Sequence, residues 1–466
     1  MKPLVLLSSL VLALLAPLFS IAQCGTSPAS GLTTISTANQ IINSYYPGTG
    51  NPITGQTSLT VGALDGRGNS TPLSNGDLVL IIQMQGADLN TNNTDAYGNG
   101  VAGAPASGAL SNNLFAGYYE YNTVSSVSGA TVNLAYSLVN NYYTRAFSAG
   151  NSIRSYQVIR VPRYYNLTID AAGSVTAPAW NGSTGGIVVL DAANVMTING
   201  SVTVAGLGFR GGGGKQFTGA TTGNSNGTTT LQNTDYRFNS PITNAANLSG
   251  AAKGESIAGR AAYTYINGAV TVQTEANEGY VNGSMGRGAP ANGGGGSTDG
   301  IPIGTNNNQY NTGGGGGANA GDGGMGGSGW HGGSGNVSTY PYGGHGGAAF
   351  PAHSLKRLIM GGGGGAGSAN NSTGANEYQS SGGPGGGIII SRAGSYAGNG
   401  SLNANGAPAP GINGNPTSNT DAAGGGGAGG TVVLVTRQAG AAGTNSLTVT
   451  ATGGAGGNMA NYYDHG

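Results

Sequence analysis

Two carboxylates raise the first question of chemistry in this sequence. Asp170 and Asp191 each open an Asp-Ala-Ala corner, and the segments around them, "LTIDAAGSVTA" from Leu167 and "VVLDAANVMTI" from Val188, align without a gap at an offset of 21 residues. If the repeats stack as neighbouring strands, the carboxylates lie about 4.8 Å apart, near the separation of about 5 to 5.5 Å used in retaining glycoside hydrolysis. The competing interpretation is a turn, because Asp side chains bond their own backbone. With no Lys or Arg beside either residue as a lyase base, the turn is favoured.

A second candidate is a binding site formed by aromatic rings. Its residues share a background of glycine that offers few large neighbours to cover them: Trp330, His331, Tyr340, Tyr342 and His345. Exposed rings stack on sugars and are enriched at interfaces. The alternative is that the rings fill gaps between glycine segments.

Other chemistry is not supported by the motifs. Matches to GxGxxG arise by chance here, and none follows a strand and opens a helix with an acidic partner downstream. "GFRGGGGKQ" has Phe209 and Gln216 where a phosphate-binding loop needs Gly and Ser or Thr. The four His residues have no nucleophile elbow nearby, and no Asp has calcium-repeat spacing. The sequence predicts no catalysis, no cofactor and no metal.

Composition narrows the class of protein further. Glycine contributes 94 of 466 residues, charged residues only 7%, and the formal net charge is zero. A nucleic-acid binder needs a basic face to displace counterions, so that class is disfavoured. Charge-driven disorder needs a high net charge, so a net charge of zero disfavours that class as well.

The N-terminus has the pattern of a secretory signal peptide. Lys2 precedes an apolar run at residues 4–19, and small residues end at Ala22, after which we expect cleavage. No later stretch is long and apolar enough for a membrane span, so we expect export without one. The single cysteine, Cys24, excludes an intrachain disulfide framework. Lipidation of Cys24 is left open, although Gln23 stands where a lipoprotein signal prefers a small residue.

The chain divides into four segments after the signal peptide. Residues 24–165 alternate apolar and polar residues between turn signals and predict an antiparallel β domain. Residues 166–206 predict the start of a parallel β-solenoid. "NGSVTVAG" from Asn199 matches "NGSLNANG" from Asn399, and "GGIVVL", "GGIII" and "GGTVVLV" repeat the same lead-in, so we expect the solenoid to resume over 385–466 and to be truncated there.

The block at 207–384 separates these solenoid parts and contains the longest glycine runs. It is either a flexible linker or packed polyglycine, in which extended helices with about three residues per turn lie side by side. Ordering glycine costs about 0.5 to 1 kcal/mol more than ordering alanine, and a net backbone hydrogen bond returns roughly 0.5 to 1.5 kcal/mol. The block would therefore fold only on a template such as the flanking strands. Its aromatic residues also favour an ordered structure.

Several motifs resemble a known group of proteins. "GDLVLIIQMQGAD", "GYYEYNTV", "YQVIRVPRYYNLTI", "INGSVTVAGLGFRGG" and "GGGIIISR" are similar to the N-terminal region of very large, type 9 secretion-associated surface proteins of gliding Gram-negative bacteria, some of them called adventurous gliding motility proteins. The resemblance covers nearly the whole mature chain and implies an exported adhesin-like role. The chain departs from that pattern at "GGAGGNMANYYDHG", where no sorting domain follows. A weaker resemblance is to phage tail-tip adhesins built from packed polyglycine helices.

Together these observations predict an all-β surface protein, secreted or on the outer cell surface of a Gram-negative bacterium, that contacts glycans or neighbouring cells and is not an enzyme. Two alternatives stay open: a secreted polysaccharide-active β-helix enzyme using Asp170 and Asp191, and a purely structural surface or matrix protein that self-associates. We expect no nucleic-acid partner and no transmembrane span.

Overall fold

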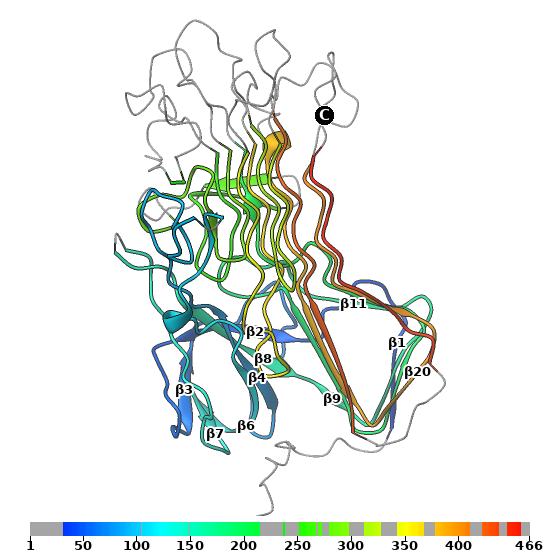
Figure 1. Ribbon diagram of the computed structural model, residues 1–466. Coiled ribbons are helices and arrows are strands. Elements are labelled where there is room, and N and C mark those ends of the chain that lie inside the picture. The colour runs from blue at the N-terminus through cyan, green and yellow to red at the C-terminus, as the bar shows by residue number, and fades with distance from the viewer. Residues whose placement is uncertain are drawn as a thin grey trace, which may run out of the picture.

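The computed structural model describes residues 31–103, 105–148, 150–214, 236–237, 251–266, 269–272, 279–297, 312–327, 343–367, 378–410, 422–437 and 445–457. The predicted signal peptide and Cys24 lie outside these ranges. The described chain is all-β, which confirms the predicted fold class, and it forms a barrel, a solenoid and a glycine bundle (Figure 1).

The barrel is closed by antiparallel strands in the order β2-β3-β7-β6-β4-β8. Strand β4 is buried along its whole length because its two faces have different partners: Val79 and Ile81 fill the barrel, whereas Leu78 and Leu80 join a second core shared with the solenoid. A continuous apolar run is the sequence pattern that such a doubly covered strand requires. The barrel strands are β2 (Ser44–Thr49), β3 (Ser58–Val61), β4 (Leu78–Gln85), β6 (Tyr119–Ser128), β7 (Thr131–Leu134) and β8 (Ser155–Val161).

The solenoid has three parallel sheets, which form three sides of a coil (Figure 1). The first contains β1 (Leu32–Ile35), β10 (Asn166–Ile169), β13 (Val195–Ile198) and β20 (Ser395–Ala397). The second contains β11 (Ser174–Thr176), β14 (Ser201–Thr203), β21 (Ser401–Asn403) and β23 (Thr448–Thr450). The third contains β9 (Arg163–Tyr164), β12 (Ile187–Ala192), β19 (Ile388–Ala393) and β22 (Thr431–Thr436).

The register of these sheets confirms one predicted repeat and corrects the other. Ser201 pairs with Ser401, and Ile187 pairs with Ile388, so the match between the two halves of the solenoid is real. The offset of 21 residues is wrong, because Leu167 pairs with Met196, at an offset of 29. The aligned "IDAA" and "LDAA" segments belong to different sheets, β10 and β12, and their similarity does not reflect stacking.

Strand β1 also departs from the sequence-based expectation. It lies within the segment 24–165, for which an antiparallel domain is predicted, yet it pairs in parallel with β10. Its position covers the edge of the first solenoid sheet that β10 would otherwise expose. The remaining short elements are β5 (Ser107–Gly108), η1 (Ser111–Asn113), β15 (Gly211–Gly212), β16 (Tyr263–Ile266), β17 (Ala269–Val272) and β18 (Ala289–Pro290).

The hydrogen bonds of its central run, residues 361–367, define how the glycine bundle is packed. Successive N–H groups of this run donate to three different neighbouring segments, and the pattern returns to the first segment after three residues. The donor and acceptor residues are Gly361 to Gly386, Gly362 to Ala318, Gly363 to Glu255, Gly364 to Gly383, Gly365 to Gly315 and Ala366 to Ala252. Its carbonyl groups accept from three further segments, through Gly212, Gly294 and Gly425. A period of three with six neighbours is the packed polyglycine arrangement, so that interpretation is confirmed for the described runs.

Close backbone approach explains why the run consists of glycine. A Cβ at Gly363 would lie 1.9 Å from the carbonyl oxygen of Arg210, and one at Gly365 would lie 1.9 Å from that of Gly295. At these two positions a side chain of any size would separate the runs and break the lateral hydrogen bonds, whereas the methyl group of Ala366 in the same run joins the apolar core.

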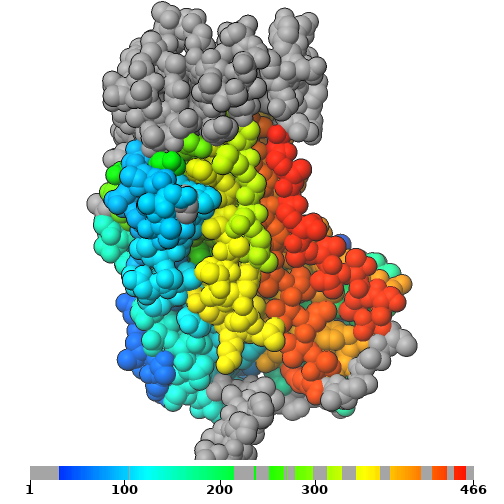
Figure 2. Space-filling view, viewed as in Figure 1, coloured from blue at the N-terminus to red at the C-terminus, as the bar shows by residue number. Residues whose placement is uncertain are grey.

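The strands of the solenoid supply the template for this bundle. Residues 381–387 lead directly into β19, where Gly387 donates to Val204 and Ile388 donates to Gly186. Residues 422–430 lead in the same way into β22. Figure 2 shows the segment 343–367, in yellow, lying between barrel segments in cyan and the C-terminal strands in orange and red.

Candidate functional site

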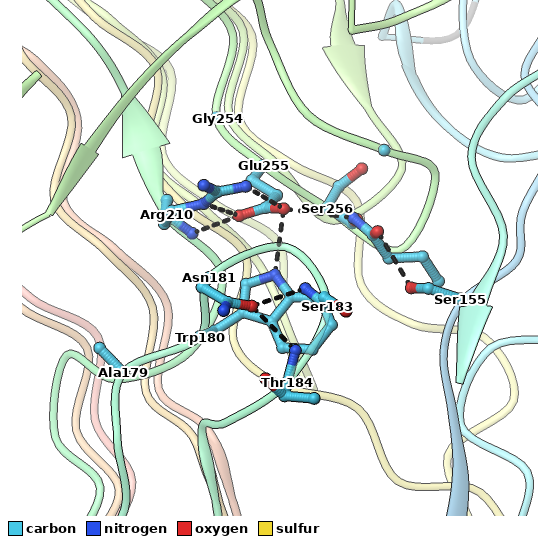
Figure 3. A network of polar contacts seen from close by, with 12 residues as sticks. Ser155, Ala179, Trp180, Asn181, Ser183, Thr184, Arg210, Gly254, Glu255 and Ser256 are labelled. Atoms are coloured by element: carbon cyan, nitrogen blue, oxygen red, sulfur yellow. Dashed lines mark hydrogen bonds and ion pairs between the residues drawn. The ribbon is translucent and has the colours of Figure 1, made fainter. Parts of the chain in front are cut away.

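A buried carboxylate joins the three parts of the molecule (Figure 3). Glu255, in the glycine bundle, accepts two hydrogen bonds from the Arg210 guanidinium, Nε to Oε2 at 2.7 Å and Nη2 to Oε1 at 3.0 Å. Trp180 of the solenoid donates its Nε1–H to Oε1 at 3.0 Å. Gln85, at the end of barrel strand β4, donates to the same oxygen at 3.4 Å.

The electrostatics of Glu255 indicate a structural clamp. Burial alone raises the pKa of this carboxyl group, but the charge of Arg210 and the hydrogen bonds from Arg210 and Trp180 outweigh it and lower the pKa below its usual value. The group is ionised and fully enclosed, with no exposed surface. A carboxylate held in this way has no proton to give and no approach for a substrate, so it stabilises the junction of the three parts.

The predicted carboxylate pair is not formed. Asp170 follows β10, and its Oδ1 accepts from the N–H groups of Ala172 and Gly173 at 3.1 and 2.9 Å, which is the expected turn. Asp191 lies within β12 and stands between Arg163 and Arg392 in the sheet register. The spacing that would suit retaining glycoside hydrolysis is therefore corrected, because these carboxylates belong to different sheets and Asp191 has cations as its ladder neighbours.

Three guanidinium groups surround Asp191. Arg392 bonds its Oδ2, Arg437 approaches the same oxygen at 2.7 Å, and Arg163 lies 3.5 Å from Oδ1. The Arg392 guanidinium also lies 3.5 Å from the ring centroid of Tyr121 on barrel strand β6. This cation–π contact fastens the barrel to the solenoid. The sequence around Asp191 does not indicate this ion-paired role. The match between residues 199 and 399 does, because an offset of 200 residues places Asp191 beside Ser391, next to Arg392.

Of the five predicted aromatic-site residues, His345 is described, and it does not form an exposed platform. Its ring stacks on Tyr236 with centroids 5.8 Å apart and planes at 18°. Burial, followed by the charges of Arg287 and Lys253, lowers the pKa of His345 to about 4. Its backbone belongs to the glycine lattice, because it donates to Arg287 and accepts from Gly295. The half-buried ring of His345 therefore packs between glycine runs, and its role in a glycan-stacking site stays a prediction. Trp330, His331, Tyr340 and Tyr342 lie outside the described residues.

The described ends of the glycine runs meet at one end of the molecule (Figure 1). Neighbouring ends are bonded to each other: Ser297 donates to Ala366 at 2.9 Å and Gly367 donates to Ser380 at 2.7 Å. Gly313 donates to Gly327 at 2.7 Å, completing the same end of the lattice. The connections at 298–311, 328–342 and 368–377 therefore start and finish on one hydrogen-bonded platform, which we call the bundle end.

Two other kinds of functional feature are absent from the described ranges. No group of three or more His, Cys, Asp or Glu side chains there is placed to hold a metal ion. Within those same ranges, no helix has the length and apolarity to cross a membrane.

Comparisons with known proteins identify no family. No protein-family model matches the chain, and no curated protein matches it. Among solved structures, the tailspike of the Acinetobacter baumannii bacteriophage AP22, in complex with A. baumannii capsular saccharide, aligns with 13% sequence identity over 37% of this chain and 29% of the tailspike chain, with a TM-score of 0.17. A TM-score this low does not indicate a shared fold.

Proposed function

We propose that this protein is an exported, adhesin-like surface protein that presents segments from a rigid glycine scaffold to glycans or neighbouring cell surfaces. The observation that carries the proposal is the bundle end, where the connections at 298–311, 328–342 and 368–377 begin and finish. Binding residues are often carried on connections held by a rigid framework, and lateral backbone hydrogen bonds make the framework rigid here.

The composition of the connections supports a role in contact. Residues 328–342 read "SGWHGGSGNVSTYPY" and include Trp330, Tyr340 and Tyr342, with no Asp, Glu, Lys or Arg. Rings with hydroxyl and amide groups suit stacking on sugars and bonding to their hydroxyl groups. The N-terminal signal pattern ending at Ala22 supports export.

The enzyme alternative has lost its specific support. Asp170 forms a turn and Asp191 forms ion pairs with arginines. The carboxylate pair on which the enzyme alternative depended is therefore not present in the described residues. The structural alternative, a surface or matrix material, depends on self-association.

The decisive experiment compares binding by the mature protein and a Trp330→Ala/Tyr342→Ala variant on glycan arrays and on intact bacterial cells. Met325→Ala is the matched control, because Met325 is an exposed residue, at 53%, on a described glycine run. We expect the double variant to lose binding and the control to keep it. Equal binding by all three proteins would contradict presentation by segment 328–342, and sequencing of the exported N-terminus, expected to begin at Gln23, tests the localisation.

A further inference from the structure

A groove crosses one corner of the solenoid, at the start of the sheet formed by β11, β14, β21 and β23. It is shallow and wide open to solvent, with a volume of about 470 Å³. The first residues of the four strands stand in register along its floor: Ser174, Ser201, Ser401 and Thr448. The groove therefore runs along the solenoid axis, with one hydroxyl group on each rung about 4.8 Å from the next.

The walls of the groove add amide groups to this hydroxyl column. Asn199 and Asn399 occupy the same corner position on successive rungs, and both are exposed at the groove. Ser174 accepts a bond from the Asn39 N–H at 2.6 Å. A carboxamide offers two donors and an acceptor, and a hydroxyl group offers both roles, so the corner can satisfy ligand groups of either kind.

The groove is uncharged. No Asp, Glu, Lys or Arg contributes to its lining within the described residues. An anionic ligand would find no cation to pair with, and a cationic ligand would find no carboxylate. A polypeptide strand would need a free sheet edge or apolar side-chain pockets, whereas this lining consists of small residues, hydroxyl groups and amides.

We propose that this axial groove binds a neutral glycan chain lying along the solenoid axis, with its hydroxyl groups bonded to the column of Ser and Thr residues and to the two Asn side chains. The repetition of the same groups on four rungs suits a ligand that repeats its own groups. This inference rests on the proposed function, since it assigns a glycan site to the same surface protein. The site lies on the solenoid and does not involve the connections of the bundle end.

The test uses the mature protein and affinity electrophoresis through gels that contain neutral glycans (laminarin, xylan, galactomannan) or acidic glycans (alginate, polygalacturonate). The variant Asn199→Ala/Asn399→Ala/Ser401→Ala removes three groups from the groove. Each lost neutral hydrogen bond should weaken binding by roughly 2- to 10-fold, so the variant should lose at least about tenfold in affinity for the retained neutral glycan. Thr197→Ala, on the neighbouring sheet beside the corner, is the matched control and should bind like the parent protein.

The outcomes separate the two proposals. If the triple variant keeps its melting temperature and binds the neutral glycan as well as the parent protein does, the proposed glycan site in the groove is contradicted. The proposed function is then unaffected. Retardation only by acidic glycans also overturns the groove, because its lining carries no cation. If the parent protein binds neither glycans nor cells, the proposed function falls and the groove inference falls with it.

Discussion

Two glycines of the bundle differ in what surrounds them. A Cβ at Gly363 would lie 1.9 Å from the Arg210 carbonyl oxygen, whereas nothing lies within 4 Å of a Cβ at Gly327. Neither has the positive backbone φ that makes glycine necessary for conformational reasons. Glycine is therefore required at Gly363 by packing alone, and Gly327 is free to change.

This contrast gives a matched pair of substitutions. Gly363→Ala must separate two backbones, which should cost roughly 1 to 3 kcal/mol or more. Gly327→Ala should be neutral or stabilise by up to about 1 kcal/mol, because alanine has fewer unfolded conformations. Melting temperatures of the two variants check this, and similar values for both would contradict the packed lattice.

Glu255 offers a test of the buried clamp. Glu255→Gln leaves the Arg210 guanidinium buried without a counterion, and breaking a buried pair in this way costs roughly 3 to 5 kcal/mol. Asp170→Asn is the control, since an Asn oxygen can accept the same two turn hydrogen bonds. Because the pKa of Glu255 is lowered on folding, its contribution is complete above the unfolded pKa of about 4.3 and declines as the pH falls further. Urea unfolding of parent and variants at pH 7 and at pH 3.5 should show the difference narrowing at the lower pH.

At the scale of elements, the aliphatic segments and their stacking on one another were predictable, whereas the pairing of β10 with β13 was not. "GGIVVL", "GGIII" and "GGTVVLV" are strands β12, β19 and β22 with their glycine lead-ins, and they stack in register as the repeat predicts. The pairing of Leu167 with Met196 could not be read from the sequence, because solenoid corners vary in length and similar Asp-Ala-Ala segments serve a turn at Asp170 and a strand at Asp191.

The candidate sites, too, could be predicted from the sequence only in part. Composition and ring content predicted an ordered glycine block, but a period of three is invisible in a run of identical residues. His345 was grouped with nearby aromatic residues in the sequence, yet its ring partner, Tyr236, lies more than a hundred positions earlier. The clamp joins Gln85, Trp180, Arg210 and Glu255 from distant segments. No local sequence pattern predicts that these four residues are in contact.

His345 makes the glycine bundle sensitive to pH. Its pKa is lowered to about 4 on folding from an ordinary value of 6.5. The unfolded chain therefore takes up a proton as the pH falls below about 6.5, while folded His345 stays neutral, and stability is lost progressively down to about pH 4. The loss should reach on the order of 3 kcal/mol. His345→Phe keeps a ring to stack on Tyr236 and removes the titration, so its free energy of unfolding should fall less between pH 7 and pH 4.5 than that of the parent. Parallel pH dependences of the two proteins would contradict a half-buried imidazole that stays neutral in the folded protein.

At the scale of the whole molecule, barrel, solenoid and glycine bundle share one apolar core. It includes Leu80 of the barrel, Val189 of the solenoid and Met360 of the bundle. The two ends of the solenoid differ, however. At the first end, β9 continues from the barrel and Gln40 pairs beside β11. At the other end, no described strand pairs with the outer edge of β22.

That outer edge is the surface on which the structural alternative depends. Strand β22 reads "TVVLVT", without charge or proline, and Leu434 and Val435 on it are 38% and 40% exposed. An apolar edge strand without protective charges pairs with strands of other molecules. Pairing between two copies of β22 about a two-fold axis would close this edge in a dimer, which is the smallest unit of such self-association.

We therefore expect concentration-dependent self-association through β22, measured by sedimentation velocity. Val435→Glu should shift the protein toward monomer, because the carboxylates of two paired strands would repel each other, while Arg392 and Arg437 nearby allow the charge within the fold. Val127→Glu is the matched control, since Val127 is also 40% exposed but lies on barrel strand β6. A parent protein that remains monomeric over the whole concentration range would contradict the edge as a contact and, with it, the reading of this protein as self-associating surface material; association abolished equally by both substitutions would place the contact elsewhere.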